Sequence, residues 1–136
     1  MASLISNTNN TTIFSDIDPN FIKNPKTGDI LLVRDERSIR QSLSNLLQTS
    51  FGERLFRPQI GGSLRNLLFE PIDGITTFEI KDRILSTINN HEPRVNNVFV
   101  DVVSDADKNE YKVSVEFSII RTRITDTINL VLERIR

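Results

Sequence analysis

The first regular pattern in the sequence is a run of leucines and isoleucines spaced three or four residues apart between Asp35 and Gly52. This spacing predicts an amphipathic helix, with Asp35 as its N-terminal cap and Gly52 as its stop signal. Arg37, Arg40 and Gln48 fall outside the apolar stripe. The stripe itself consists of Ile39, Leu43, Leu46 and Leu47.

Residues Phe51–Ser63 are predicted to form an irregular loop rich in glycine. Two more helices are predicted between this loop and Pro93. Ser63 is expected to cap a short helix that Pro71 ends. The segment Thr76–Glu79 has the form of a capping box, in which a hydroxyl and a carboxylate satisfy free backbone donors at a helix start. The helix that follows carries the apolar stripe Ile80, Ile84, Leu85 and Ile88.

After Val95 the hydrophobic period changes from nearly four to two, which predicts strands. A polar turn at Asp105–Asn109 joins the first two strands into a hairpin. The alternating positions are Val98, Val100 and Val102, then Tyr111, Val113, Val115, Phe117 and Ile119, and finally Ile128, Leu130 and Leu132. This order predicts an α+β fold, with helices packed on one face of a C-terminal antiparallel β-meander.

The last predicted strand, Thr127–Ile135, is an open edge strand if the sheet is a simple meander. Its unpaired backbone donors and acceptors are then a template for a strand of another chain. The alternative is that Glu133, Arg134 and Arg136 only keep this edge soluble.

The sequence of 136 residues has room for one domain. Met1–Thr12 is rich in Ser, Asn and Thr and has no hydrophobic period, a composition typical of chain without a packed core. We therefore expect a flexible arm over residues 1–13, followed by a single domain over residues 14–136.

Composition excludes several classes of function. With 17 Lys+Arg against 18 Asp+Glu, the chain lacks the basic excess of a nucleic-acid binder. The absence of Cys and the single His exclude disulfides, thiolate metal sites and cysteine nucleophiles, and no cofactor or metal is expected. No run approaches the roughly 20 apolar residues that span a bilayer, so no membrane partner is expected.

Candidate acid–base groups are scattered. A glycoside hydrolase needs two carboxyl groups about 5–10 Å apart, one of them with a raised pKa. The candidates are Glu53, Glu70, Asp73 and Glu92, and their spacing brings no pair together reliably. The sequence therefore predicts no enzyme.

The tripeptide Glu92-Pro93-Arg94 lies where the last predicted helix must end and the sheet begin. Pro93 fixes the backbone there, so the two charged side chains are held at a defined corner. Two interpretations have equal weight. Arg94 either binds a carboxylate or carbonyl of a partner, or forms an intramolecular ion pair with Glu92.

Taken in order, these segments resemble the baseplate wedge family of contractile phage tails. That family is sometimes labelled lysozyme-like, and its relatives include the wedge component of type VI secretion systems. The resemblance covers roughly Phe14 to the C-terminus. The segments that carry it are Phe14–Pro19, Arg37–Leu43, Gly52–Pro58, Gly61–Leu64, Leu67–Glu70 and Glu92–Val95.

The resemblance implies a non-enzymatic structural part of the virion tail baseplate, near the tail tube, assembled in the host cytoplasm and present in several copies. It implies contacts of Glu92, Pro93 and Arg94 with other wedge proteins. It also implies that the tail sheath protein adds a strand at the last strand of the sheet, where the alternating residues are Ile128, Leu130 and Leu132. The enzymatic alternative is a tail-associated muramidase that uses Glu53, Glu70 or Glu92.

Overall fold

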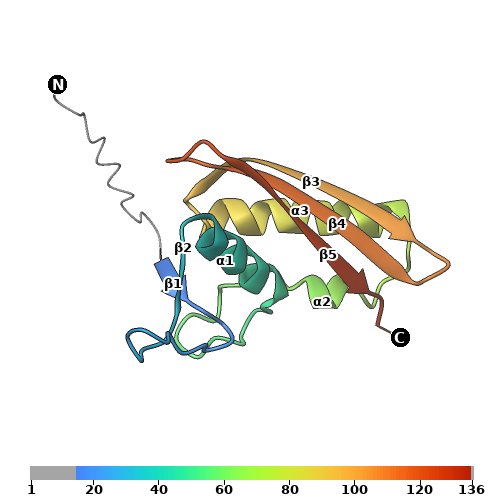
Figure 1. The fold of residues 1–136 in the computed structure, drawn as a ribbon. Helices are drawn as coiled ribbons and strands as arrows, with labels where there is room; N and C mark the ends of the chain where they lie inside the picture. Colours follow the sequence, from blue (N-terminus) through green and yellow to red (C-terminus); the bar gives the residue numbers. More distant parts are fainter. Residues whose placement is uncertain (1–14, 136) are drawn as a thin grey trace, which may run out of the picture. The chain divides into compact units, whose positions relative to one another are not determined.

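The computed structural model describes residues 15–135, which fall into two compact units. The first ends at Ile39 and the second begins at Arg40. Figure 1 shows the order of the elements along the chain. The flexible arm expected over residues 1–13 lies outside the described residues, and the single domain over residues 14–136 stays a prediction.

The first unit contains a small antiparallel ladder of two strands, β1 (Ser15–Ile17) and β2 (Leu32–Arg34). A single bridge between Lys23 and Ile30 lies between them in the sequence. Neither β1 nor β2 is predicted from the sequence pattern. A strand of three residues is too short to display an alternating pattern.

Helix α1 spans Glu36–Gln48, and the four residues of its predicted stripe are all buried. The carbonyl of Asp35 accepts the hydrogen bond of the Ile39 N–H, so the helix begins at the expected place. It ends four residues before Gly52, whose φ of 86° lies in the left-handed region that glycine tolerates. The predicted amphipathic helix is confirmed.

The two later helices exist. Ser63 holds the N-cap position of α2 as predicted, but the predicted start of α3 is wrong. α2 covers Leu64–Leu67, and Ser63 makes no side-chain cap, because its hydroxyl accepts the Phe51 N–H at 3.0 Å. α3 covers Gly74–His91 and is capped by Asp73, whose carboxylate accepts the Thr76 N–H at 2.7 Å.

The expected capping box at Thr76–Glu79 is therefore replaced by an earlier start at Asp73. Thr76 falls within the first turn of α3, and its side chain is buried rather than available as a cap. Hydrogen bonds from Thr76 lower the pKa of Asp73.

No helix in residues 15–135 has the length and apolar character needed to cross a membrane.

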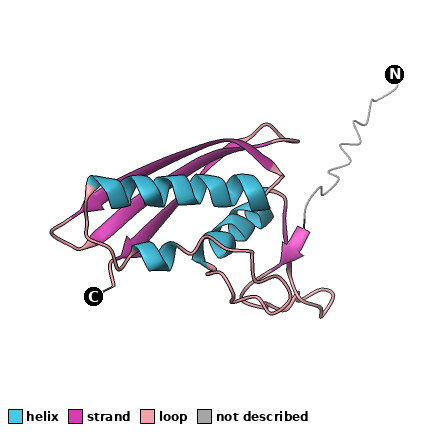
Figure 2. Ribbon diagram, turned by 180° about the vertical axis from the view of Figure 1, so that it is seen from behind, coloured by secondary structure: helices cyan, strands magenta, loops and turns pink. Residues whose placement is uncertain are grey.

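The sheet of the second unit contains β3 (Val95–Asp105), β4 (Glu110–Ile119) and β5 (Thr125–Glu133). Its order is β3-β4-β5 with antiparallel neighbours, so β4 is central and both β3 and β5 are edge strands. Figures 1 and 2, seen from opposite sides, show α3 running along one face of this sheet. The predicted α+β fold with an open edge strand is confirmed.

The core of this unit lies between α3 and the inner face of the sheet. Ile80, Ile84 and Ile88 of α3 are fully buried. All five alternating residues of β4 are buried as well, namely Tyr111, Val113, Val115, Phe117 and Ile119. The intervening residues of β4 are more exposed, so the period of two read from the sequence separates the two faces of the sheet.

Replacing Ile84 by Ala tests this assignment of the core. We expect a loss of about 2–5 kcal/mol in the free energy of unfolding, because the substitution leaves a cavity between α3 and the sheet. The matched control is Ile75→Ala, since Ile75 lies on the same helix but is 72% exposed, and should change stability by less than about 0.5 kcal/mol. Urea denaturation measures both, and equal losses would contradict the assignment.

Candidate functional site

The corner between α3 and β3 is built around the carboxylate of Glu92, which is only 4% exposed. Nε of Arg94 donates to Oε1 of Glu92 at 2.6 Å, and Nη2 of Arg94 donates to Oε2 at 2.6 Å. The hydroxyl of Ser42 on α1 donates to Oε2 at 2.8 Å. The carboxylate is therefore held by a two-pronged guanidinium contact and by a helix 50 residues away in sequence.

Burial of the Glu92 carboxyl raises its pKa, but the opposing effects are larger. Hydrogen bonds from Arg94 and Ser42, together with the positive charge of Arg94, bring the pKa of Glu92 below its ordinary value of 4.5. Glu92 is thus held as a carboxylate at neutral pH. Of the two interpretations of this tripeptide, the intramolecular ion pair is present, and Pro93 between the two charges is exposed.

The hydrogen-bonding direction of each β5 residue follows from the β4–β5 register. The Arg134 N–H donates to the carbonyl of Asn109 at 2.8 Å, which turns Arg134 toward β4. In an antiparallel ladder this direction alternates from one residue to the next, and β5 pairs without a register shift. The backbone groups that face outward therefore belong to Thr127, Asn129, Val131 and Glu133.

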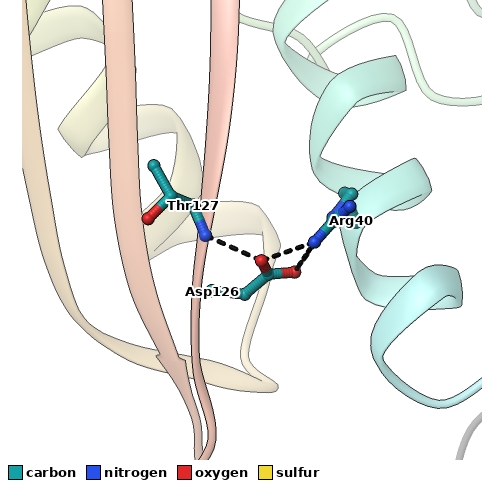
Figure 3. Close-up of polar contacts among 3 residues, drawn as sticks. All are labelled: Arg40, Asp126 and Thr127. Carbon is teal, nitrogen blue, oxygen red and sulfur yellow. Dashed lines mark hydrogen bonds and ion pairs between the residues drawn. The ribbon is translucent and has the colours of Figure 1, made fainter.

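Both ends of this outward edge are occupied within the chain. At the start of β5, Oδ1 of Asp126 accepts the Thr127 N–H at 2.8 Å, and the Asp126 carboxylate also accepts hydrogen bonds from Nε and Nη2 of Arg40 on α1 (Figure 3). Beyond the other end, the Ile135 N–H donates to the carbonyl of Leu68 at 2.9 Å.

Between these ends, the outward N–H groups of Asn129, Val131 and Glu133 have no hydrogen-bond partner among residues 15–135. We call the outward backbone of residues 127–133 the edge window. It is a short stretch of unpaired sheet edge with a closed contact at each side.

The residues predicted for strand addition are not the outward-facing ones, but alternate with them along β5. Ile128 is buried, and Leu130 and Leu132 are half-buried and register with Val113 and Tyr111 of the core. Their backbone groups face β4. The alternation that marked these residues in the sequence is the pattern of an inward face, and it gives no signal for the outward positions.

Three of the four candidate carboxylates are held by local hydrogen bonds or an ion pair. Glu53 accepts the Ser50 N–H at 2.9 Å, and Asp73 caps α3. The pKa of Glu92 is lowered, which is the opposite of what a general acid requires. Within residues 15–135 no group of three or more His, Cys, Asp or Glu side chains is arranged to hold a metal ion.

Comparison with known proteins gives the family. The family model described as "Baseplate wedge protein gp25" matches residues 33–125, which is more than half of the chain. The chain belongs to the baseplate wedge protein gp25 family. The baseplate wedge protein gp25 of Enterobacteria phage T4 is 33% identical over 108 residues, which cover 79% of this chain and 81% of that protein.

Two solved structures share the fold of this baseplate wedge protein. A chain of the anti-feeding prophage baseplate has a TM-score of 0.63 and 24% identity, covering 90% of this chain and 87% of that one. A candidate tail lysozyme from Geobacter sulfurreducens has a TM-score of 0.71 and 21% identity, covering 78% of this chain and 96% of that one. At these identities the likeness concerns the fold.

Membership of the family makes the chain a structural component of the virion tail baseplate, with other baseplate proteins as its partners. The resemblance inferred from the sequence motifs is thereby confirmed. The family supports a structural rather than an enzymatic role.

Changing Glu92 to Gln tests the corner. The folded-state pKa of Glu92 is depressed, so its stabilising contribution is complete above the ordinary pKa of 4.5 and is lost as pH falls through the lower folded-state value. We expect Glu92→Gln to cost about 2 kcal/mol at neutral pH, because it leaves the half-buried Arg94 without its counter-charge.

The difference in unfolding free energy between wild type and Glu92→Gln should shrink as pH falls below 4.5 through the lower folded-state pKa of Glu92. Urea denaturation across this range measures it. Glu70→Gln, at an exposed position, is the control and should show little difference at any pH. A difference that is constant with pH would contradict the ion-pair assignment.

Proposed function

We propose that this baseplate wedge protein starts the assembly of the contractile sheath by accepting a strand of the sheath protein at the edge window. The observation that carries this proposal is the row of outward N–H groups at Asn129, Val131 and Glu133, which have no partner among residues 15–135. Backbone hydrogen bonds supply affinity in such strand additions, and alternating side chains supply register.

The contacts at the ends of the window define the strand that fits. The Asp126 carboxylate already occupies the Thr127 N–H and is itself bound to Arg40, so the incoming strand stops at this side. The bond from Ile135 to Leu68 closes the other side. The seven residues of the edge window, 127–133, span about 23 Å at roughly 3.3 Å per residue, a length suited to a short strand.

The corner is proposed to contact neighbouring wedge proteins. Its exposed Pro93 lies between two side chains that bind each other, so Glu92 and Arg94 hold the shape of the contact surface. A surface fixed in this way loses little conformational entropy when a partner binds. The same ion pair supports the proposal that Glu92 takes no part in glycoside hydrolysis.

The Val131→Pro variant tests strand addition. Proline removes the outward N–H of Val131 without removing a bond to β4, so the chain should fold and enter baseplates. We expect sheath initiation to weaken about tenfold, through the lost hydrogen bond and the bulk of the ring at the edge. Counting sheathed and bare tails by electron microscopy measures the effect.

The matched control is Ser104→Pro on β3, the opposite edge of the same sheet. Ser104 is exposed, and the alternation along the β3–β4 register turns its N–H away from β4. This variant should form sheathed tails normally. Normal sheathing by a folded Val131→Pro chain, or equal loss with Ser104→Pro, would refute the proposed role of β5.

The Arg94→Ala variant tests the corner contact. We expect it to reduce incorporation into wedge complexes at temperatures where the isolated chain is still fully folded, because the contact surface loses its shape before the fold is lost. Sedimentation of assembled complexes and thermal unfolding of the free chain are compared. Incorporation that falls only where the free chain unfolds would leave the ion pair with a purely intramolecular role.

The muramidase alternative is tested by a peptidoglycan-clearing assay. The purified chain should clear nothing. Clearing that disappears in single Glu→Gln variants at Glu53, Glu70 or Glu92 would overturn the structural assignment.

A further inference from the structure

The loop that follows α1 carries the most exposed large apolar side chains among residues 15–135. Leu55 is 92% exposed and Phe56 is 96% exposed, against 72% for the next residue of this kind, Ile75. Both lie at the centre of a turn in which the Arg57 N–H donates to the carbonyl of Arg54 at 3.3 Å. Central turn positions favour Gly, Pro, Asn, Asp and Ser, so a Leu-Phe pair there has no local conformational reason.

The base of this loop is fixed, and the exposed pair is therefore a defined feature of the surface. The Gly52 N–H donates to the Pro58 carbonyl at 2.8 Å and closes the loop. A Cβ on Gly61 would lie 2.5 Å from the carbonyl oxygen of Thr49, so the returning chain packs directly against the end of α1. The Gly62 N–H adds a bond to the same carbonyl at 3.0 Å.

The charges of the loop point to the chemistry of its partner. The guanidinium groups of Arg54 and Arg57 flank the apolar pair and form no ion pair with any side chain of residues 15–135. The nearby Glu53 carboxylate accepts the Ser50 N–H at the base of the loop. The tip thus combines two apolar side chains with two uncompensated positive charges.

We propose that the turn Arg54–Arg57 is a docking tip, which inserts Leu55 and Phe56 into an apolar pocket rimmed by carboxylates on another baseplate protein. Aromatic and Arg side chains are the residue types that contribute most to protein interfaces when they enter a pocket. The carboxylates on the rim match the two guanidinium groups. Two apolar side chains are too few to anchor a protein stably in a membrane, which favours a protein partner.

This docking tip is distinct from the edge window and from the corner. It uses side chains rather than backbone groups, and it lies on the loop between α1 and α2 rather than on the sheet. It concerns entry of the chain into the wedge, whereas the edge window concerns the later addition of sheath. The proposal therefore stands or falls independently of strand addition.

The double variant Leu55→Ser/Phe56→Ser tests the docking tip. Its urea midpoint should equal that of the wild type, because both side chains are already in water. Its incorporation into baseplates assembled from the other wedge proteins should fall at least about tenfold, through loss of the two inserted side chains. The matched control is Ile75→Ser/Phe78→Ser, a second exposed apolar pair at the start of α3, which should assemble within about twofold of the wild type.

Charge-reversal variants test the proposed carboxylate rim of the partner's pocket independently. Arg54→Glu/Arg57→Glu should reduce incorporation about tenfold or more, while Arg121→Glu, at an exposed position in the turn between β4 and β5, should not. Raising the salt concentration should weaken the wild type and leave the reversed variant little changed. Normal incorporation of Leu55→Ser/Phe56→Ser or of Arg54→Glu/Arg57→Glu would overturn the proposal, as would wild-type binding to anionic phosphatidylglycerol vesicles that depends on Leu55 and Phe56.

Discussion

The period of two along β5 determines which groups of this protein are free to meet another molecule. Ile128, Leu130 and Leu132 direct their side chains to the core face and their backbone groups to β4, so these residues are committed twice within the fold. The residues between them direct neither their side chains to the core nor their backbone groups to β4. Because β4 is central and β5 is an edge strand, the backbone groups of these intervening residues form an open edge, and their side chains lie on the exposed face of the sheet.

Helix α1 connects the two polar sites beside this sheet. Arg40 binds Asp126 at the start of β5, and Ser42 binds Glu92 just before β3. Each contact adds a partner on α1 to a carboxylate that also binds a neighbour in sequence, Thr127 for Asp126 and Arg94 for Glu92. The two contacts differ in weight, because Arg40 is 55% exposed and the Glu92 carboxylate is nearly inaccessible. The first limits the edge window in length, and the second stabilises the corner.

The sequence predicts the parts of the fold that repeat locally. The stripes of α1 and α3 and the alternation of β4 follow from spacing alone, as does the order of helices before a meander. Asp73 was not predicted as the cap of α3 because Thr76–Glu79 offers a stronger local motif three residues later in the sequence. The partners of Glu92 and Asp126 on α1 lie 50 and 86 residues away, so no spacing rule reveals them. The β5 residues that face outward can be assigned only from the register with β4, which only the folded chain provides.

The most direct test of the edge window is a cryo-EM structure of the baseplate that contains this chain, with its first layer of sheath attached. We expect a strand of a sheath subunit beside β5, hydrogen-bonded to the backbone of Asn129 and Val131 and ending at the Asp126–Arg40 contact. An outer edge of β5 that faces solvent or an unrelated surface, with the sheath attached elsewhere, would contradict the proposed mode of sheath initiation.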